Sequence, residues 1–445
     1  MSSCLKTKIS MKLRLIIMNF LQFAVWGAYL TSMGNYLGNA GLGANIGVFY
    51  SIQGVVSIFM PALMGIVADR WIPAQKLLGI CHGIAGALMI AAGWYGLTTD
   101  AVQFSTLFTL YSLSVAFYMP TLALSNSVAY NALDKAGLDT VKAFPPIRVF
   151  GTIGFICTMW VVNLLGFKED ISWATITVFD KESISFQSTA AQYVISGGLG
   201  LILAIYSFTL PECPISKNSG EKTLVEALGL NAFALFKEYR MAIFFIFSML
   251  LGMMLQITNG YANPFISSFG AFPEYANTFG VQYANILISL SQMSETLCIL
   301  LIPFFLKRFG IKNVMLMAML AWMLRFGFFG MGNPGSGVWL FILSMIVYGM
   351  AFDFFNISGS LFVDKEVSTN MRSSAQGLFM MMTNGFGATI GVLAAQAIVN
   401  HYCQYNATGH LVGDWTTVWY IFAGFALIVA IAFALIFREK KNNNI

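Results

Sequence analysis

The sequence predicts an all-α polytopic membrane protein, with twelve transmembrane helices in two six-helix bundles. Composition is the first reason, because 58% of the 445 residues are hydrophobic and only 10% are charged, which is more apolar than a soluble domain requires. The second reason is that apolar runs of spanning length recur along the whole chain. The third is that basic residues concentrate in alternate connections between these runs.

The apolar runs that are long enough to cross a bilayer are twelve in number. They cover residues 13–37, 44–68, 75–96, 101–129, 145–166, 190–210, 241–265, 281–306, 311–331, 336–362, 373–399 and 416–437. We expect the first run to persist as a membrane helix, because it is too long for a signal-peptide core and lacks an A-x-A exit. The even number of runs predicts that both termini lie on one side of the membrane.

The distribution of lysine and arginine gives the orientation. With the N-terminus inside, 20 of the 24 basic residues fall in inner connections, and only Lys168 and Lys181 fall in outer loops. This bias predicts that both termini are cytoplasmic. The net charge of +5 follows from the same bias and does not indicate binding to nucleic acid.

The longest inner connection divides the chain near its middle. We expect an N-terminal six-helix bundle over 1–210, a cytoplasmic linker over 211–240 and a C-terminal six-helix bundle over 241–445. The linker is polar at first and then has the pattern of a short amphipathic helix at 223–237. Basic loops after the second and eighth runs indicate duplicated halves. The long polar outer loop at 166–190 is interpreted as a tolerated insertion in preference to a small cap.

Charged residues inside apolar runs are the first candidates for function. Glu295 lies in the eighth run and Asp353 in the tenth, while Arg148 opens the fifth. A charge at the bilayer centre costs roughly 2.5–3.5 kcal/mol even on a lenient scale, so it normally faces protein or water. A carboxyl group there can take up a proton at one membrane face and release it at the other. The alternative is an ion pair that only fixes helix packing, and it is strongest for Arg325 in the ninth run.

Polar side chains at helical spacing form four faces on four different runs. These faces consist of Gln256 and Asn259, of Gln292 and Glu295, of Asp353 and Asn356, and of Arg148, Thr152 and Phe155. A single amide more often joins two helices, but four such faces predict a shared polar cavity. Aromatic residues accompany them, namely Phe155, Tyr348 and Phe352. Rings stack on flat ligands and amides bind hydroxyls or base edges, so the cavity suits a flat, polar, uncharged ligand.

Gly65, Asp69 and Arg70 end the second run and are candidates for a conformational latch between helix bundles. The alternative is a solvated turn that follows the charge bias. The sequence contains no GxxxxGK[ST], no HExxH, no nucleophile elbow and no spacing typical of a metal site. We therefore expect neither an enzyme, nor a metal, nor a bound cofactor.

The twelve runs and the Gly65-x-x-x-Asp69-Arg70 loop resemble the major facilitator superfamily, although Ile72 stands where a glycine is common and the loop at 303–313 has no matching aspartate. Within it, long stretches are similar to the nucleoside:proton symporter family. These stretches are 20–30, 59–71, 144–155, 237–259, 291–315 and 344–368.

The resemblance implies proton-coupled nucleoside uptake by alternating access, in a monomer of the bacterial inner membrane that uses the proton as its coupling ion. It places the substrate contacts on Arg148, Thr152, Phe155, Gln256, Asn259, Gln292, Glu295, Tyr348, Phe352 and Asp353. Asp353 and Glu295 are the candidates for proton coupling, and Asp353 is preferred because it lies among aromatic residues.

Other functions fit the same residues. A proton-coupled sugar or oligosaccharide porter also needs amides, acids and stacking rings, and a nucleoside-sensing receptor would bind without transport. The preference between purine and pyrimidine nucleosides is left open by the sequence.

Overall fold

The computed structural model describes residues 2–168, 171–180, 182–215, 230–368 and 371–438. The first half contains α1 (Ser2–Gly27), α2 (Met33–Asn39), η1 (Gly43–Asn45), α3 (Ile46–Arg70), α4 (Ala74–Thr98), α5 (Phe104–Lys135), α6 (Thr140–Leu164), β1 (Leu165–Phe167), η2 (Trp173–Thr175), β2 (Ile176–Val178), β3 (Ile184–Ser185), η3 (Phe186–Ser188) and α7 (Ala191–Ser207). The second half contains η4 (Leu230–Lys237), α9 (Tyr239–Ser268), η5 (Phe269–Ala271), α10 (Phe279–Gln282), α11 (Ala284–Met331), α12 (Val338–Glu366), α13 (Arg372–Met380), the π-helix η7 (Met381–Gly387), α14 (Ala388–Tyr402), β4 (Cys403–Tyr405), β5 (Leu411–Gly413) and α15 (Trp415–Ile436).

Ten helical segments of the described chain are long and apolar enough to cross a membrane. One of them, α11, is 48 residues long and is interrupted at Gly310, whose φ of 76° and ψ of 169° are not helical. Glycine permits this conformation at little cost, and α11 is therefore two spans that meet at a sharp turn. With this division and the shorter apolar helix α7, of 17 residues, the segments correspond one by one to the twelve predicted runs.

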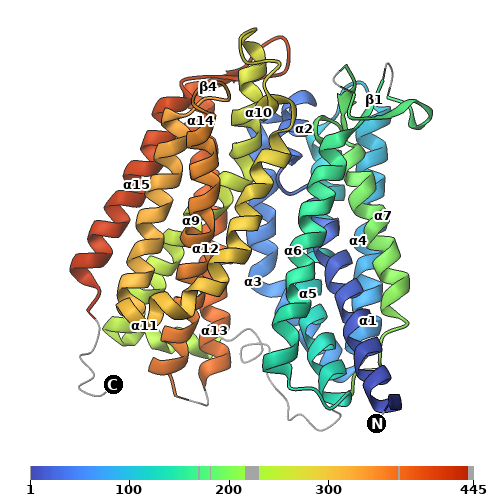
Figure 1. The fold of residues 1–445 in the computed structure, drawn as a ribbon, viewed down its shortest axis with the longest axis vertical. Helices are drawn as coiled ribbons and strands as arrows, with labels where there is room; N and C mark the ends of the chain where they lie inside the picture. The colour runs from blue at the N-terminus through green and yellow to red at the C-terminus, as the bar shows by residue number, and fades with distance from the viewer. Residues whose placement is uncertain (1, 169–170, 181, 216–229, 369–370, 439–445) are drawn as a thin grey trace.

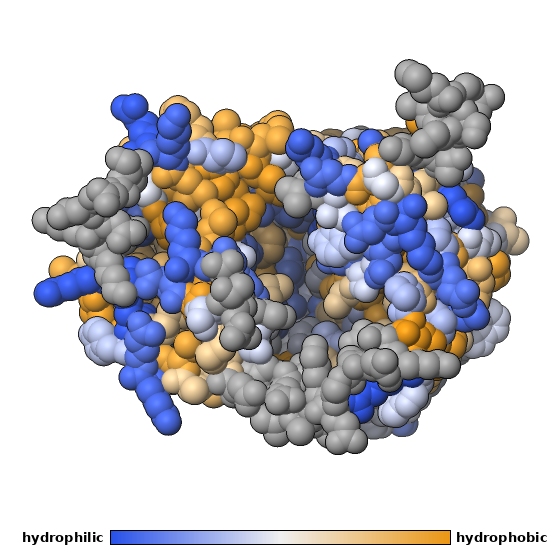
Figure 2. All heavy atoms as spheres, turned by 90° about the horizontal axis from the view of Figure 1, so that it is seen from below, coloured by the Kyte–Doolittle hydropathy of each residue, from blue (hydrophilic) through white to orange (hydrophobic). Residues whose placement is uncertain are grey.

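The helices form two groups that stand side by side (Figure 1). In the first group α4 packs against α5 and α7, and α1 packs against α6; in the second, α11 packs against α12 and α15. Both ends of the described chain lie at the same end of the molecule, which we call the terminal face, and the opposite end is the distal face (Figure 1). Seen from the terminal face, the surface is hollowed between the two halves (Figure 2).

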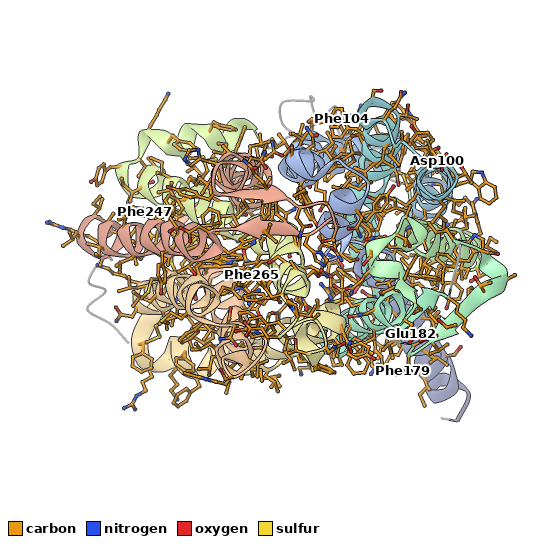
Figure 3. All side chains as sticks on the ribbon, turned by 90° about the horizontal axis from the view of Figure 1, so that it is seen from above. Asp100, Phe104, Phe179, Glu182, Phe247 and Phe265 are labelled. Carbon is orange, nitrogen blue, oxygen red and sulfur yellow. The ribbon has the colours of Figure 1, made fainter. Side chains whose placement is uncertain are left out.

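Aromatic packing holds the second group together at its distal end. Phe265 of α9 lies in the middle of this half (Figure 3), and its ring centroid is 5.3 Å from those of Trp415 and Trp419 and 5.5 Å from that of Phe341. Such tilted and edge-on contacts stabilise aromatic pairs beyond the area that they bury. The cluster fixes α9, α12 and α15 relative to one another.

The outer loop at 166–190 has a structure of its own. The interpretation of this loop as a tolerated insertion, in preference to a small cap, is therefore wrong. The described residues of the loop form an antiparallel sheet in the order β2-β1-β3. Phe167 and Phe186 are buried with Val162 and Ala191 beneath this sheet. The loop therefore buries apolar side chains of its own and caps the distal end of the first half.

A network of buried side chains joins the two halves at the distal face. Thr31 Oγ1 donates to Asn285 Oδ1 (3.1 Å), and Asn263 Nδ2 donates to the same atom (2.8 Å). Asn263 Nδ2 also lies 3.3 Å from Oε1 of Gln187, a residue of the cap. The backbone carbonyl of Gln187 accepts a hydrogen bond of 3.0 Å from Gln192 Nε2. None of these residues is more than 4% exposed. The halves are thus sealed at the distal face and separated at the terminal face.

The first part of the amphipathic helix predicted at 223–237 lies outside the described residues, which resume at Leu230. From there the chain forms the 3-10 helix η4, and α9 follows it. Residues 216–229 of the predicted linker at 211–240 are outside the described part of the chain, and the division into bundles at 1–210 and 241–445 stays a prediction.

Gly391 allows α14 to pack directly on α9. A Cβ atom at this position would lie 2.2 Å from the carbonyl oxygen of Met253, which is a backbone atom and cannot move aside. We expect Gly391→Ala to lower the stability by about 1–3 kcal/mol, the usual cost of overpacking. Thermal unfolding in detergent measures this change. Gly327→Ala is the matched control, because a Cβ there meets nothing within 4 Å, and equal melting temperatures for the two variants would contradict the expectation.

Candidate functional site

Arg148 of α6 is a cation of the first half that faces acids of the second half. It interacts electrostatically with Glu295 of α11 and with Asp353 of α12. No ion pair within 4.0 Å is formed by Arg148 in the described chain. Its guanidinium instead lies over the ring of Phe23, with Cζ 3.8 Å from the ring centroid. The guanidinium of Arg148 therefore packs on Phe23, while its charge interacts with the carboxyl groups of Glu295 and Asp353.

The first segment of α11 contributes Gln292 and Glu295. Gln292 is 8% exposed, and its buried Oε1 has no hydrogen-bond partner. One turn earlier, Ser289 accepts a bond of 2.9 Å from Trp160 Nε1 of α6. This contact fastens α6 to α11 next to the predicted polar face.

Asp353 of α12 is 5% exposed, and its buried Oδ2 has no hydrogen-bond partner. The rings of Tyr348 and Phe352 stack beside it on the same helix, with centroids 5.8 Å apart and planes 7° from parallel. Two parallel rings and a buried carboxyl oxygen are suited to hold a flat ligand with a polar edge.

Arg325 supports Tyr348 from the side of the second segment of α11. Its Cζ lies 4.5 Å from the tyrosine ring centroid. Arg325 Nη1 donates to the backbone oxygen of Ser344 (2.8 Å) and to Ser291 Oγ (3.2 Å). These contacts join α11 to α12 through a cation–π pair and hydrogen bonds. Arg325 thus fixes helix packing, but through these contacts and not through the ion pair that was considered as the alternative.

Gln256 and Asn259 of α9 form a chain of amides that crosses into the first half. Asn259 Nδ2 donates to Gln256 Oε1 (2.6 Å), and Gln256 Nε2 lies 3.4 Å from Gln53 Oε1 of α3. Gln53 Nε2 in turn donates to the hydroxyl of Tyr111 (2.8 Å). Gln53 was not among the predicted site residues, although an amide in the interior of the apolar run at 44–68 was a signal that could have identified it.

We expect Gln53→Leu to raise the KM for transported substrate by about 2- to 12-fold. The reason is that Gln256 loses the acceptor for its amide nitrogen, and a hydrogen bond contributes about 0.5–1.5 kcal/mol. Uptake kinetics measure the change. Gln404→Leu, at an exposed position of strand β4, is the control for loss of an amide elsewhere. An unchanged KM in Gln53→Leu would show that this bond does not hold Gln256.

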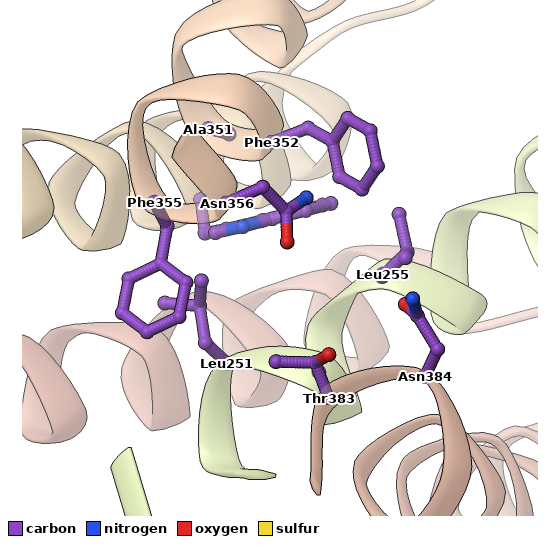
Figure 4. A pocket seen from close by; sticks show the side chains of 10 residues that line it. Leu251, Leu255, Ala351, Phe352, Phe355, Asn356, Thr383 and Asn384 are labelled. Atoms are coloured by element: carbon purple, nitrogen blue, oxygen red, sulfur yellow. The ribbon is translucent and has the colours of Figure 1, made fainter. Parts of the chain in front are cut away.

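Phe155 and Thr152 complete the face of α6. Phe155 is 7% exposed and meets Trp26 edge-on, with centroids 6.4 Å apart. Thr152 lies one turn after Arg148 and is half-buried. Helix α11 packs against α6, α9 and α12, so it contacts each of the three other helices that carry a predicted polar face. Asn356 lines a pocket between α9, α11, α12 and η7 that Phe352 also lines, whereas Asp353 is not among its lining residues (Figure 4).

The candidate latch residues lie where α3 ends at the terminal face. Helix α3 runs to Arg70, and a Cβ atom at Gly65 would meet nothing within 4 Å. The side chain of Asp69 is outside the described part of the structure. The latch formed by Gly65, Asp69 and Arg70 stays a prediction.

Comparisons with known proteins link the chain to membrane transporters. The sequence profile described as the nucleoside H⁺ symporter family matches residues 9–442. A xanthosine permease of Escherichia coli (strain K12) is 47% identical over 437 residues, which are 97% of this chain and 97% of that protein. The nucleoside permease NupG of the same organism is 48% identical over 434 residues, also 97% of each chain.

Solved structures agree on the fold. The crystal structure of the nucleoside transporter NupG superposes with a TM-score of 0.83 at 47% identity, over 97% of this chain and 100% of that chain. A D-xylose-proton symporter superposes with a TM-score of 0.67 at 13% identity, over 98% of this chain and 99% of that chain, and this likeness concerns the fold alone. The predicted helical transporter fold is confirmed, and the relatives are transporters rather than enzymes.

Proposed function

Because the chain belongs to the nucleoside H⁺ symporter family, we propose that it takes up nucleosides together with protons at a site between its two halves. The observation that supports this site best is the position of Arg148. A cation of the first half interacts across the molecular centre with Glu295 and Asp353 of the second half. A ligand or proton bound there alters contacts of both halves, which is the coupling that a symporter requires.

Nine of the ten predicted contact residues then divide into three kinds. Amides and Arg148 bind base edges or ribose hydroxyls, since Gln256, Asn259 and Gln292 each offer both a donor and an acceptor. Phe155, Tyr348 and Phe352 pack against the flat base. Glu295 binds ribose hydroxyls, and Asp353 carries the proton. No cofactor is needed for this cycle.

Alternating access is supported by the asymmetry between the two faces. The distal network of Thr31, Asn263 and Asn285 closes one end, while the other end is hollowed (Figure 2). We infer that the terminal face is cytoplasmic, in accord with the lysine and arginine bias, and that the structure represents the inward-facing state. The protein would then be a monomer of the bacterial inner membrane, with rocking bundles at 1–210 and 241–445 and a linker at 211–240 between them.

Competition for uptake into proteoliposomes tests the substrate class. We expect unlabelled adenosine and uridine to compete with labelled uridine, and free ribose to leave uptake unchanged. Inhibition by ribose or oligosaccharides at least as strong as that by adenosine would favour a sugar porter. Equilibrium binding of uridine without counterflow of the labelled nucleoside would instead indicate a receptor.

A further inference from the structure

A small cavity lies inside the first half, where α4, α5 and α7 meet the end of α1, and it is large enough for about one water molecule. Its walls carry the polar side chains of Tyr29, His82, Ser114, Tyr118 and Ser196. Each of these residues is at most 2% exposed. None of the ten predicted contact residues lines the cavity, so it is separate from the candidate site.

The hydrogen bonds around Gln22 fix which nitrogen of His82 carries a proton. The Thr121 hydroxyl donates to the backbone oxygen of Tyr118 (2.5 Å), so Thr121 Oγ1 accepts from Gln22 Nε2 (2.8 Å). Gln22 Oε1 is therefore the amide atom that faces His82 Nε2, at 2.8 Å. Because an amide oxygen only accepts hydrogen bonds, His82 Nε2 donates and carries the proton.

The other nitrogen of His82 is a bare acceptor. No acidic side chain of the described chain lies within 4.0 Å of the imidazole nitrogens, and a buried charge without an ion partner is costly, so the ring is neutral. In a neutral ring that is protonated at Nε2, Nδ1 has a lone pair and no proton. The buried Nδ1 has no hydrogen-bond partner among the described residues. The imidazole therefore lacks a donor for Nδ1.

The same cavity offers a donor and two spare acceptors. The hydroxyl of Tyr29 is buried and has no hydrogen bond within 3.5 Å in the described part of the chain. Ser114 donates its hydroxyl proton to the backbone oxygen of Ala85 (2.7 Å). Ser196 donates likewise to that of Val25 (2.7 Å). Each serine oxygen can still accept a hydrogen bond.

Glycines form the wall of the cavity between α4 and α7. A Cβ atom at Gly197 of α7 would lie 2.5 Å from the carbonyl oxygen of Gly86 of α4, and one at Gly86 would lie 2.8 Å from that of Gly197. The two helices therefore meet backbone to backbone at this point. These glycines supply no side-chain partner for His82 or Tyr29.

We propose that the cavity binds one water molecule, which donates to His82 Nδ1 and to a serine oxygen and accepts from the Tyr29 hydroxyl. About three hydrogen bonds are typical of a buried water, and unpaired buried polar groups cost free energy. Tyr118 adds a bond of 2.9 Å from its hydroxyl to the backbone oxygen of Gln22. The water thus completes a buried polar network that ties α4, α5 and α7 to α1, and this inference does not depend on the proposed function.

A crystal structure of the full chain, at a resolution that shows ordered water, tests the site directly. We expect density for one water molecule about 2.7–3.2 Å from both His82 Nδ1 and the Tyr29 hydroxyl oxygen. Absence of density in the cavity would overturn the site. A direct hydrogen bond between Tyr29 and His82 would overturn it as well.

Tyr29→Phe removes the proposed donor and keeps the aromatic ring. We expect this variant to melt in detergent about 1–3 °C below the unmodified chain, because the water loses a hydrogen bond. Tyr193→Phe is the matched control, since its hydroxyl is also buried without a partner but does not line the cavity. Loss of an unpaired hydroxyl should not lower the melting temperature. An equal fall in both variants, or no fall in Tyr29→Phe, would contradict the bridge.

Discussion

Asp353→Asn is expected to abolish the accumulation of nucleoside while exchange of nucleoside across the membrane continues. An asparagine side chain has nearly the same volume but cannot take up the proton. One charge moving down 100 mV supplies about 2.3 kcal/mol, enough for roughly fiftyfold accumulation of a neutral ligand. Without coupling, the ratio of internal to external uridine should fall to about one. Asp353 is assigned this role because it is 5% exposed and its Oδ2 has no partner, so that proton binding removes a buried charge.

Glu295→Gln is the matched comparison, since it also replaces a carboxyl group by an amide near Arg148. We expect it to weaken uridine binding and to reduce both exchange and accumulation. Uptake into vesicles with an imposed pH gradient, measured beside counterflow, separates the two variants. If Asp353→Asn still concentrates uridine with full pH dependence, the proton is carried elsewhere and Glu295 becomes the first candidate.

Arg148→Met should reduce nucleoside uptake about 100-fold. Glu295 and Asp353 would lose the cation with which both interact, and the substrate would lose a hydrogen bond to a charged group, which contributes about 1.5–3 kcal/mol. Arg148→Lys keeps the charge but loses the planar group that lies over Phe23. Lysine and arginine are not equivalent in such stacked positions, so we expect an intermediate loss of roughly tenfold.

Arg308→Met makes the same chemical change at an exposed position of α11, where the guanidinium lies 5.9 Å from the ring centroid of Phe309. Uptake by this control should remain within about twofold of the unmodified chain, as is usual for exposed charges. Rates of labelled uridine uptake at matched protein levels compare the three variants. Full uptake by Arg148→Met would show that Arg148 is not needed for nucleoside transport.

Hydropathy predicted the helices well, because spanning length acts on each segment separately. The break at Gly310 fell between two predicted runs for the same reason. The polar faces on α6, α9, α11 and α12 were also visible, since helical spacing alone places Gln292 beside Glu295.

Contacts between distant helices could not be predicted in this way. The bond between Gln256 and Gln53 and the position of Arg148 over Phe23 depend on how the helices pack, and a single chain carries no periodic signal of that packing. The distal cap was misjudged because its length and polarity resemble those of an exposed loop. Its short strands bury only a few apolar side chains, among them Phe167 and Phe186.

Proton-driven uptake of uridine into proteoliposomes tests the central claim most directly. The proteoliposomes contain the purified full chain, and an inward proton gradient is imposed across their membrane. We expect uridine to rise inside above its external concentration, protons to enter with it, and a protonophore to return the ratio to about one. Equal final uridine levels with and without the gradient, in vesicles that still exchange uridine, would contradict proton coupling.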